Sequence, residues 1–195
     1  MVLAPALQAD PIYPYTLKIF TSNGSFSDSN DLNLYVEVSD AGAGLADFTF
    51  YNDSLIESCI EGIYFDDGTL LGIASVTGSS GVSFSQPASP AALPGGNILE
   101  PPFVTSAQFS IDSDPPGPKN GVNPNEWLRI TFDLKNNALF QDVIGELNTG
   151  AIRIGAHITA LPDDSSESAV NYTPEPATIC LLGLGTLALL RKRRV

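Results

Sequence analysis

The sequence predicts an all-β protein: an antiparallel β-sandwich with a jelly-roll-like arrangement, one short helix and a separate hydrophobic helix at the C-terminus. Many short segments alternate apolar and polar residues with the period of two that a half-buried strand shows. The 17 glycines and 15 prolines are spread along the chain and favour frequent turns over long helices. With 195 residues, of which 43% are hydrophobic, the chain can form one hydrophobic core.

Three segments show the alternation most clearly: residues 32–38, 128–134 and 152–158. In the second of them, Leu128, Ile130 and Phe132 share one face, and the intervening residues are polar or charged. Seven weaker strand candidates are residues 15–21, 46–51, 60–65, 70–76, 81–85, 103–111 and 167–172. So many short strands separated by turns favour a sandwich.

One segment has the spacing of a helix instead. Its apolar residues fall on one helical face, and Asn148-Thr149-Gly150 provides an end signal. These apolar residues are Leu139, Phe140, Val143, Ile144 and Leu147. We expect a single helix here that connects two strands and packs on the sandwich.

The charge is distributed unevenly along the chain. The formal net charge is -13, but four of the nine basic residues lie within the last five positions. Residues 1–172 contain five basic and 21 acidic side chains, a net charge of -16. Such a surface repels nucleic acid and anionic lipid and attracts divalent cations or basic partners, so nucleic-acid binding is excluded.

The C-terminal tail combines an apolar run with a basic cluster. Residues 177–190 form 14 consecutive apolar or small positions. As a helix they would be roughly 21 Å long, against about 30 Å for the hydrocarbon core of a bilayer. We therefore expect a temporary membrane anchor with its basic end in the cytoplasm. The membrane stop consists of Arg191, Lys192, Arg193 and Arg194.

Pro174, Glu175 and Pro176 stand directly before the apolar run, and their prolines resist helix formation. This order, Pro-Glu-Pro, then a Leu/Gly-rich run, then terminal arginines, resembles the PEP-CTERM sorting signal over residues 173–194. The resemblance implies recognition of Pro174, Glu175 and Pro176 by exosortase, a membrane-embedded cysteine protease of Gram-negative bacteria. It also implies export, with transient anchoring in the inner membrane before the protein reaches the cell surface or the extracellular space.

These observations divide the chain into three parts: residues 1–9, an acidic β-sandwich domain at 10–172, and the sorting signal with its short transmembrane helix at 173–195. Residues 1–9 lack the basic and long apolar regions of a signal peptide. However, Ala4-Pro5-Ala6 and Ala9 are similar to the small-residue end of one. We expect the remainder of a signal peptide, or a disordered N-terminus, and an in-frame apolar segment upstream of Met1.

Paired carboxylates beside turns are the candidate metal ligands. The acidic loops contain Asp66, Asp67, Asp112 and Asp114, and hard cations such as calcium bind oxygen donors that loops bring together. Neither loop has the full spacing of a calcium-binding loop. The favoured alternative is that Asp67-Gly68 forms an ordinary hairpin turn between two strands. Apart from calcium, we expect no cofactor.

Catalytic motifs are missing from the sequence. His157 is the only histidine, and in the strand at 152–158 it faces away from the isoleucines, which is typical of an exposed or hydrogen-bonded structural residue. There is no nucleophile elbow, no metal-binding histidine pair and no phosphate loop. Cys59 and Cys180 lie in different parts of the chain, so no disulfide is expected, and Cys59 is interpreted as a small buried apolar residue.

Binding is the remaining class of function. Trp127, Tyr64, Tyr35 and Tyr51 could form an aromatic platform for sugar rings, although aromatic residues in strands usually belong to the core or to cross-strand pairs. Exosortase systems are associated with exopolysaccharide production. The resemblance to the PEP-CTERM signal therefore implies exopolysaccharide as a partner of this protein. We expect an exported, non-enzymatic surface or extracellular-matrix protein. The alternative is a secreted carbohydrate-active enzyme of the glycoside hydrolase type, in which distant carboxylates meet.

Overall fold

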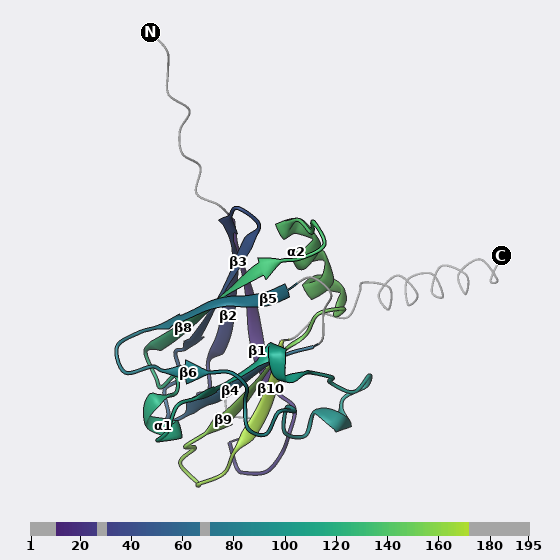
Figure 1. The fold of residues 1–195 in the computed structure, drawn as a ribbon. Helices are drawn as coiled ribbons and strands as arrows, with labels where there is room; N and C mark the ends of the chain where they lie inside the picture. The colour runs from purple at the N-terminus through teal and green to yellow at the C-terminus, as the bar shows by residue number, and fades with distance from the viewer. Residues whose placement is uncertain (1–10, 27–30, 67–70, 172–195) are drawn as a thin grey trace, which may run out of the picture.

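The computed structural model describes residues 11–26, 31–66 and 71–171, which form one antiparallel sheet of ten strands (Figure 1). Neighbouring strands follow the order β5-β8-β3-β2-β1-β10-β9-β4-β7-β6. The strands are β1 (Ile12–Ile19), β2 (Leu34–Gly42), β3 (Leu45–Asn52), β4 (Cys59–Phe65), β5 (Leu71–Gly78), β6 (Phe84–Ser85), β7 (Ser110–Ser113), β8 (Glu126–Leu134), β9 (Ile154–Thr159) and β10 (Glu167–Asn171). The helices are α1 (Gly117–Asn120), α2 (Phe140–Thr149) and the 3-10 turns η1 (Gly96–Ile98) and η2 (Ala107–Phe109).

Strand β1 belongs to both halves of this sheet. Its first part, from Ile12 to Thr16, pairs with β2, and its last three residues, from Leu17 to Ile19, pair with β10. The sheet therefore turns over at β1, and its two halves face each other across the core (Figure 1). The predicted antiparallel all-β architecture is confirmed, but one sheet, nearly closed like a barrel, replaces two separate sheets.

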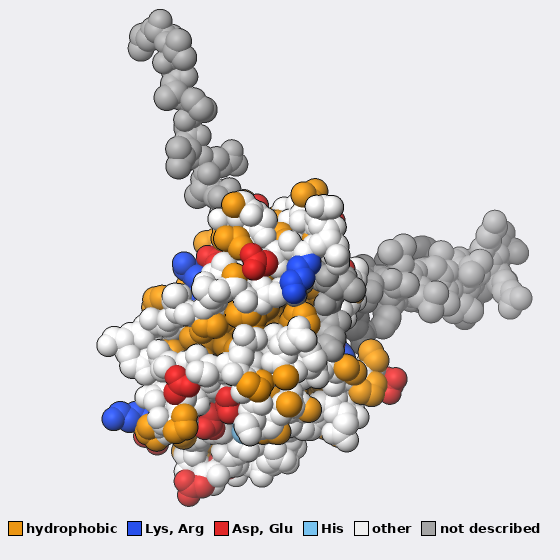
Figure 2. Space-filling model, in the orientation of Figure 1, with side chains coloured by type: hydrophobic (Ala, Val, Ile, Leu, Met, Phe, Trp, Pro, Cys, Tyr) orange, Lys and Arg blue, Asp and Glu red, His pale blue; other side chains and the backbone are white. Residues whose placement is uncertain are grey.

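Strands β5 and β6 are the two ends of the sheet, so the barrel stays open between them. Half-buried apolar side chains, among them Ile73, Phe84 and Phe109, pack against the core near this opening. Figure 2 shows apolar surface along this side of the molecule. The edge strand β6 has only two residues and therefore offers few unpaired backbone groups to another chain, which limits aggregation at this edge.

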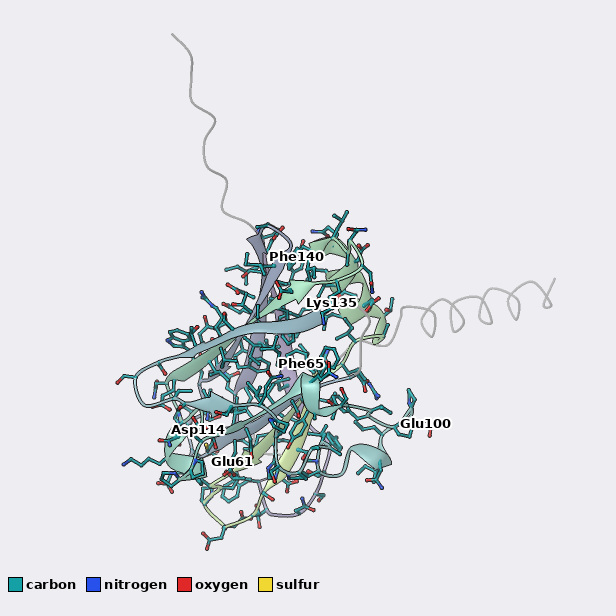
Figure 3. The ribbon with its side chains drawn as sticks, viewed as in Figure 1. Glu61, Phe65, Glu100, Asp114, Lys135 and Phe140 are labelled. Carbon is teal, nitrogen blue, oxygen red and sulfur yellow. The ribbon has the colours of Figure 1, made fainter. Side chains whose placement is uncertain are left out.

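Four phenylalanines connect the two halves. Phe65 of β4 meets Phe132 of β8 at 4.8 Å between ring centroids, Phe48 of β3 at 5.3 Å and Phe50 at 6.2 Å, all edge to face. The four side chains are at most 1% exposed, and Figure 3 shows Phe65 between the halves. Edge-to-face contacts of this kind add to the stabilisation from buried apolar area.

The predicted helix is confirmed as α2, whose buried residues include Phe140, Val143 and Leu147. Asp142 accepts a hydrogen bond from the backbone N–H of Leu139 at 2.7 Å, and Gly150 ends the helix with φ of 75°. Leu139 itself is 68% exposed, because it is the residue before the first turn rather than part of the apolar face.

Most predicted strands are present, with two corrections. Residues 103–111 were expected to form one strand, but only Ser110 and Ile111 of this range are extended in β7, after the 3-10 turn η2. The backbone N–H of Val104 instead donates to the Asp66 carboxylate at 2.6 Å, which draws this segment away from strand pairing.

The prediction that Asp67-Gly68 is a hairpin turn requires β4 and β5 to pair with each other, and this is wrong. β4 pairs with β7 and β9, whereas β5 pairs with β8. Asp67 and Gly68 themselves lie outside the described residues.

A long connection covers the outer face of the β4–β9 half. Residues 86–105 place Leu93 and Phe103 over Tyr64, forming a second, smaller apolar cluster. Gly155 of β9 permits this close approach, because a Cβ there would lie 2.7 Å from a Leu93 methyl carbon. The barrel thus has an apolar layer outside the sheet as well as inside it.

The contact of Phe65 with three rings of the other half predicts its effect on stability. Phe65→Ala should lower the free energy of unfolding by about 3–5 kcal/mol, because it leaves a cavity between the halves. Leu55→Ala is the control: Leu55 is 85% exposed, and the change should be below about 0.5 kcal/mol. Urea denaturation measures both values, and equal losses for the two variants would contradict this description of the core.

Candidate functional site

The sorting signal is attached to the barrel through β10. The residues predicted to carry it, Pro174, Glu175 and Pro176, and the membrane stop at 191–194 lie outside the described residues. Asn171, the last residue of β10, is buried, and its Oδ1 accepts a hydrogen bond from the backbone N–H of Ile154 at 2.7 Å. Among the described helices, none is long and apolar enough to cross a bilayer.

A buried carboxylate fixes the start of β10. Glu167 is fully buried and accepts hydrogen bonds from Thr21 Oγ1 at 2.5 Å and from the backbone N–H groups of Asn23 and Gly24 at 2.7 and 2.8 Å. Three hydrogen bonds thus converge on the two carboxyl oxygens of Glu167. They join the segment after β1 to β10, so the strand that leads to the tail is held on both flanks and at its beginning.

The first predicted metal ligand, Asp66, is paired with Arg153. The carboxylate of Asp66 lies 2.5 Å from Arg153 Nε, and the two side chains are 12% and 13% exposed. Arg153 also donates to the carbonyl oxygens of Pro101 and Pro102, each at 2.7 Å. Together with the bond from Val104 to Asp66, this pair attaches the 101–104 segment to the ends of β4 and β9.

The other predicted metal ligands lie at a different place. Asp112 is on β7, opposite Gly62, and Asp114 follows β7 and accepts a hydrogen bond from Ser83 Oγ at 2.5 Å. Asp67 lies outside the described residues. In the part of the chain that the structure describes, no three His, Cys, Asp or Glu side chains are grouped so that they could hold a metal ion. Because Asp67 is part of the predicted set, the calcium site stays a prediction.

The structure brings His157 together with two acidic residues that sequence reasoning did not connect. His157 of β9 and Asp112 of β7 both pair with Gly62 of β4, and Glu61 occupies the β-bulge beside it. Burial lowers the pKa of His157, while the charges of Glu61 and Asp112 oppose this shift. Burial is also the main cause that raises the pKa of Asp112, and Glu61 contributes to the increase.

His157 faces away from the core isoleucines, as predicted, since Ile154 and Ile158 are fully buried in the core and His157 is half-buried. No alternation pattern could have predicted that Glu61 lies beside it, because the bulge shifts the register at this position.

Cys59 is buried, as expected, and its thiol donates to the carbonyl oxygen of Pro118 at 3.3 Å. Burial raises the pKa of its thiol to about 12, so the thiolate form is strongly disfavoured.

Three of the four predicted platform residues form a row. Tyr35, Tyr51 and Trp127 are direct cross-strand neighbours on β2, β3 and β8, and all three are half-buried on the outer face. The Tyr35 and Tyr51 rings stack at 5.0 Å with an angle of 18° between their planes, and the guanidinium of Arg129 lies 5.9 Å from the Trp127 ring. The stacked tyrosines are the cross-strand pair that was the favoured interpretation.

Tyr64 does not belong to this row. It lies on β4 in the other half, buried beneath residues 86–105, and its hydroxyl donates to the carbonyl oxygen of Pro90 at 3.1 Å. Polar groups surround the remaining three rings: Tyr35 donates to Asp53 at 2.9 Å, and Arg129 Nε donates to Thr49 at 3.1 Å. Partial burial and the Asp53 carboxylate raise the pKa of Tyr35 to about 12, so this hydroxyl stays protonated.

Comparison with known proteins identifies the tail. Residues 173–194 match the PEP-CTERM protein-sorting motif, in agreement with the resemblance described above. The motif implies an exported protein that exosortase processes and that is sorted to the cell surface. No curated protein and no solved structure matches the chain.

The burial of His157 predicts a loss of stability in mild acid. Its folded-state pKa lies below the usual 6.5, so below pH 6.5 the unfolded chain takes up a proton that the folded chain does not. Stability should therefore fall as the pH drops through this window. The melting temperature should fall between about pH 7.5 and about pH 5.5, and fall less in His157→Gln. Equal decreases in the two proteins would show that His157 does not contribute.

Proposed function

We propose that the protein is held briefly in the inner membrane by its apolar tail, is cut near Pro174-Glu175-Pro176, and then acts outside the cell as a non-enzymatic surface or matrix component. The match of residues 173–194 to the sorting motif carries this proposal. The length of the apolar run supports temporary anchoring, since 14 residues are short for a stable transmembrane helix.

The position of the body relative to the motif supports the same sequence of events. Asn171 is fixed in the barrel, and Pro174 follows three positions later, within roughly 10 Å of chain. A membrane protease that acts on the motif therefore acts next to a folded domain. Cleavage removes the apolar run and four of the nine basic residues, which leaves an acidic, tail-free barrel.

Exopolysaccharide is the partner that we propose for the barrel. The row of Tyr35, Tyr51 and Trp127 supports this, because it lies on an outer sheet face among hydrogen-bonding side chains. Aromatic faces and edges contact the apolar faces of sugar rings, and Arg129 and Asp53 offer a donor and an acceptor for hydroxyl groups. Because the two tyrosines stack on each other, only their outer sides are available to a ligand.

A second candidate function is carbohydrate hydrolysis. The observation in its favour is the half-buried Asp112, whose pKa is raised by burial and by the nearby Glu61. Glycoside hydrolysis uses a pair of carboxyl groups, of which the general acid has a raised pKa. Release of reducing ends from the host polysaccharide distinguishes the candidates, since a hydrolase would produce them and a structural component would not.

The proposal predicts the fate of a variant of the recognition element. In the native host, Glu175→Ala should accumulate as the uncut, membrane-associated form, because Glu175 is the only charged residue of the Pro-Glu-Pro segment. Membrane fractionation followed by gel electrophoresis measures the ratio of uncut to cut protein.

Glu57→Ala is the matched control, because it removes an exposed carboxylate from the body and leaves the motif intact. It should be processed like the wild type. Processing of Glu175→Ala at the wild-type level would show that this carboxylate is not recognised.

A further inference from the structure

The outer face of β2, β3 and β8 carries Tyr35, Tyr51 and Trp127 side by side, and we call these three residues the aromatic row. Neighbouring strands lie about 4.8 Å apart, so the row extends roughly 10 Å across the sheet, which is longer than one sugar ring. The three side chains are half-buried, yet none of them packs on either apolar cluster of the body. Packing of the core therefore does not account for three large aromatic side chains at this place.

A carboxylate stands beside each tyrosine of the row. The Tyr35 hydroxyl donates to Asp53 Oδ2 at 2.9 Å. Glu37 follows Tyr35 by two positions on the same face of β2. Burial is the main cause that raises the pKa of Tyr51, and the charge of Glu37 and a hydrogen bond to it add to the increase. Both tyrosines therefore stay protonated, and each has an acidic group next to its hydroxyl.

The cation next to the row already has an acidic partner. Arg129, which lies near the Trp127 ring, places its Nη1 3.6 Å from Asp47 Oδ2. The other ion pair among the described residues lies in the opposite half, so Glu37 and Asp53 have no cationic partner in the part of the chain that the structure describes. The aromatic row is therefore bordered by two carboxylates whose charge no side chain of the described body compensates.

Rings and carboxylates together select the charge of a ligand. Aromatic rings contact the apolar faces of sugar rings, and their π-faces attract cations. Carboxylates form charge-assisted hydrogen bonds with ammonium groups. A polymer of uronic acids would instead bring its own carboxylates beside Glu37 and Asp53, and like charges at short distance repel each other. A polysaccharide with free amino groups thus matches both the aromatic row and the charge around it.

We propose that the aromatic row binds a polysaccharide with free amino groups, whose ammonium groups lie beside the carboxylates of Glu37 and Asp53. The exopolysaccharide of the proposed function, on which this assignment rests, is then a polymer of amino sugars. Its positive charge also suits the body as a whole, because residues 1–172 contain 21 acidic and only five basic side chains. The overall charge attracts the polymer, and the aromatic row with its two carboxylates gives it a place to bind.

Two oligosaccharides that differ only at their nitrogen atoms test the charge of the ligand. Glucosamine oligomers carry free amino groups, whereas N-acetylglucosamine oligomers of the same length are uncharged. At about pH 6 the Asp and Glu carboxylates are ionised, and most glucosamine amino groups are protonated. Isothermal titration calorimetry on the full-length protein, in a detergent without sugar headgroups, measures both affinities. The glucosamine oligomer should bind about five- to thirtyfold more tightly, the range expected from two exposed ion pairs.

A double variant of the two carboxylates locates the effect. Glu37→Gln combined with Asp53→Asn keeps the shapes and the hydrogen-bond acceptors, and it should bind both oligomers as weakly as the wild type binds the N-acetylated one. An unchanged affinity for the N-acetylated oligomer shows that the variant is folded. The matched control is Glu100→Gln combined with Asp164→Asn, which makes the same charge change at exposed positions of the other half and should bind like the wild type.

Three outcomes overturn the assignment: equal affinities of the wild type for the two oligomers, equal losses in the two double variants, or equally tight binding of an oligolysine with the same number of amino groups. The last two would mean that negative charge alone attracts the ligand. Equal binding of both oligomers that Trp127→Ala weakens would leave the aromatic row as a polysaccharide site, so the proposed function would stand. Binding of neither oligomer would overturn the row as the site of the proposed partner as well.

Discussion

The division of β1 between two partners determines the shape of the molecule. Because Ile12 to Thr16 pair with β2 and Leu17 to Ile19 pair with β10, one strand carries the sheet from one half of the barrel to the other. This brings Phe65 of β4 against Phe132 of β8, since the two halves can then face each other. It also decides where β10 lies, and therefore where the sorting tail leaves the body.

Charged side chains hold in place the segments around β10, where the tail leaves the body. Glu167 is buried and binds the segment that follows β1, and the Asp66–Arg153 pair holds residues 101–104 against β4 and β9. Removing one partner of the largely buried Asp66–Arg153 pair leaves an uncompensated charge, which is costly. Asp66, one of the predicted metal ligands, thus has a structural partner in Arg153.

The periodic spacing of apolar residues predicted the individual strands and the helix. Alternation at 32–38 and 128–134 identified β2 and β8, and the helical spacing of Phe140, Val143 and Leu147 identified α2, because these faces are buried against the core. Pairing between distant strands was not predictable: β4 and β5 are consecutive along the chain yet pair with different strands. The meeting of Glu61, Asp112 and His157 depends on a β-bulge and on three strands far apart in sequence. The tail was recognisable because its order of residues is itself the signal.

The tail is a sorting signal that is removed from an acidic barrel. Intact-mass measurement of the mature protein from its native host tests this removal. The measured mass should lack the apolar run at 177–190 and the Arg-Lys-Arg-Arg cluster, so that the released protein has lost four positive charges. A mature, exported protein that still contains Val195 would contradict it and would make the tail a permanent anchor.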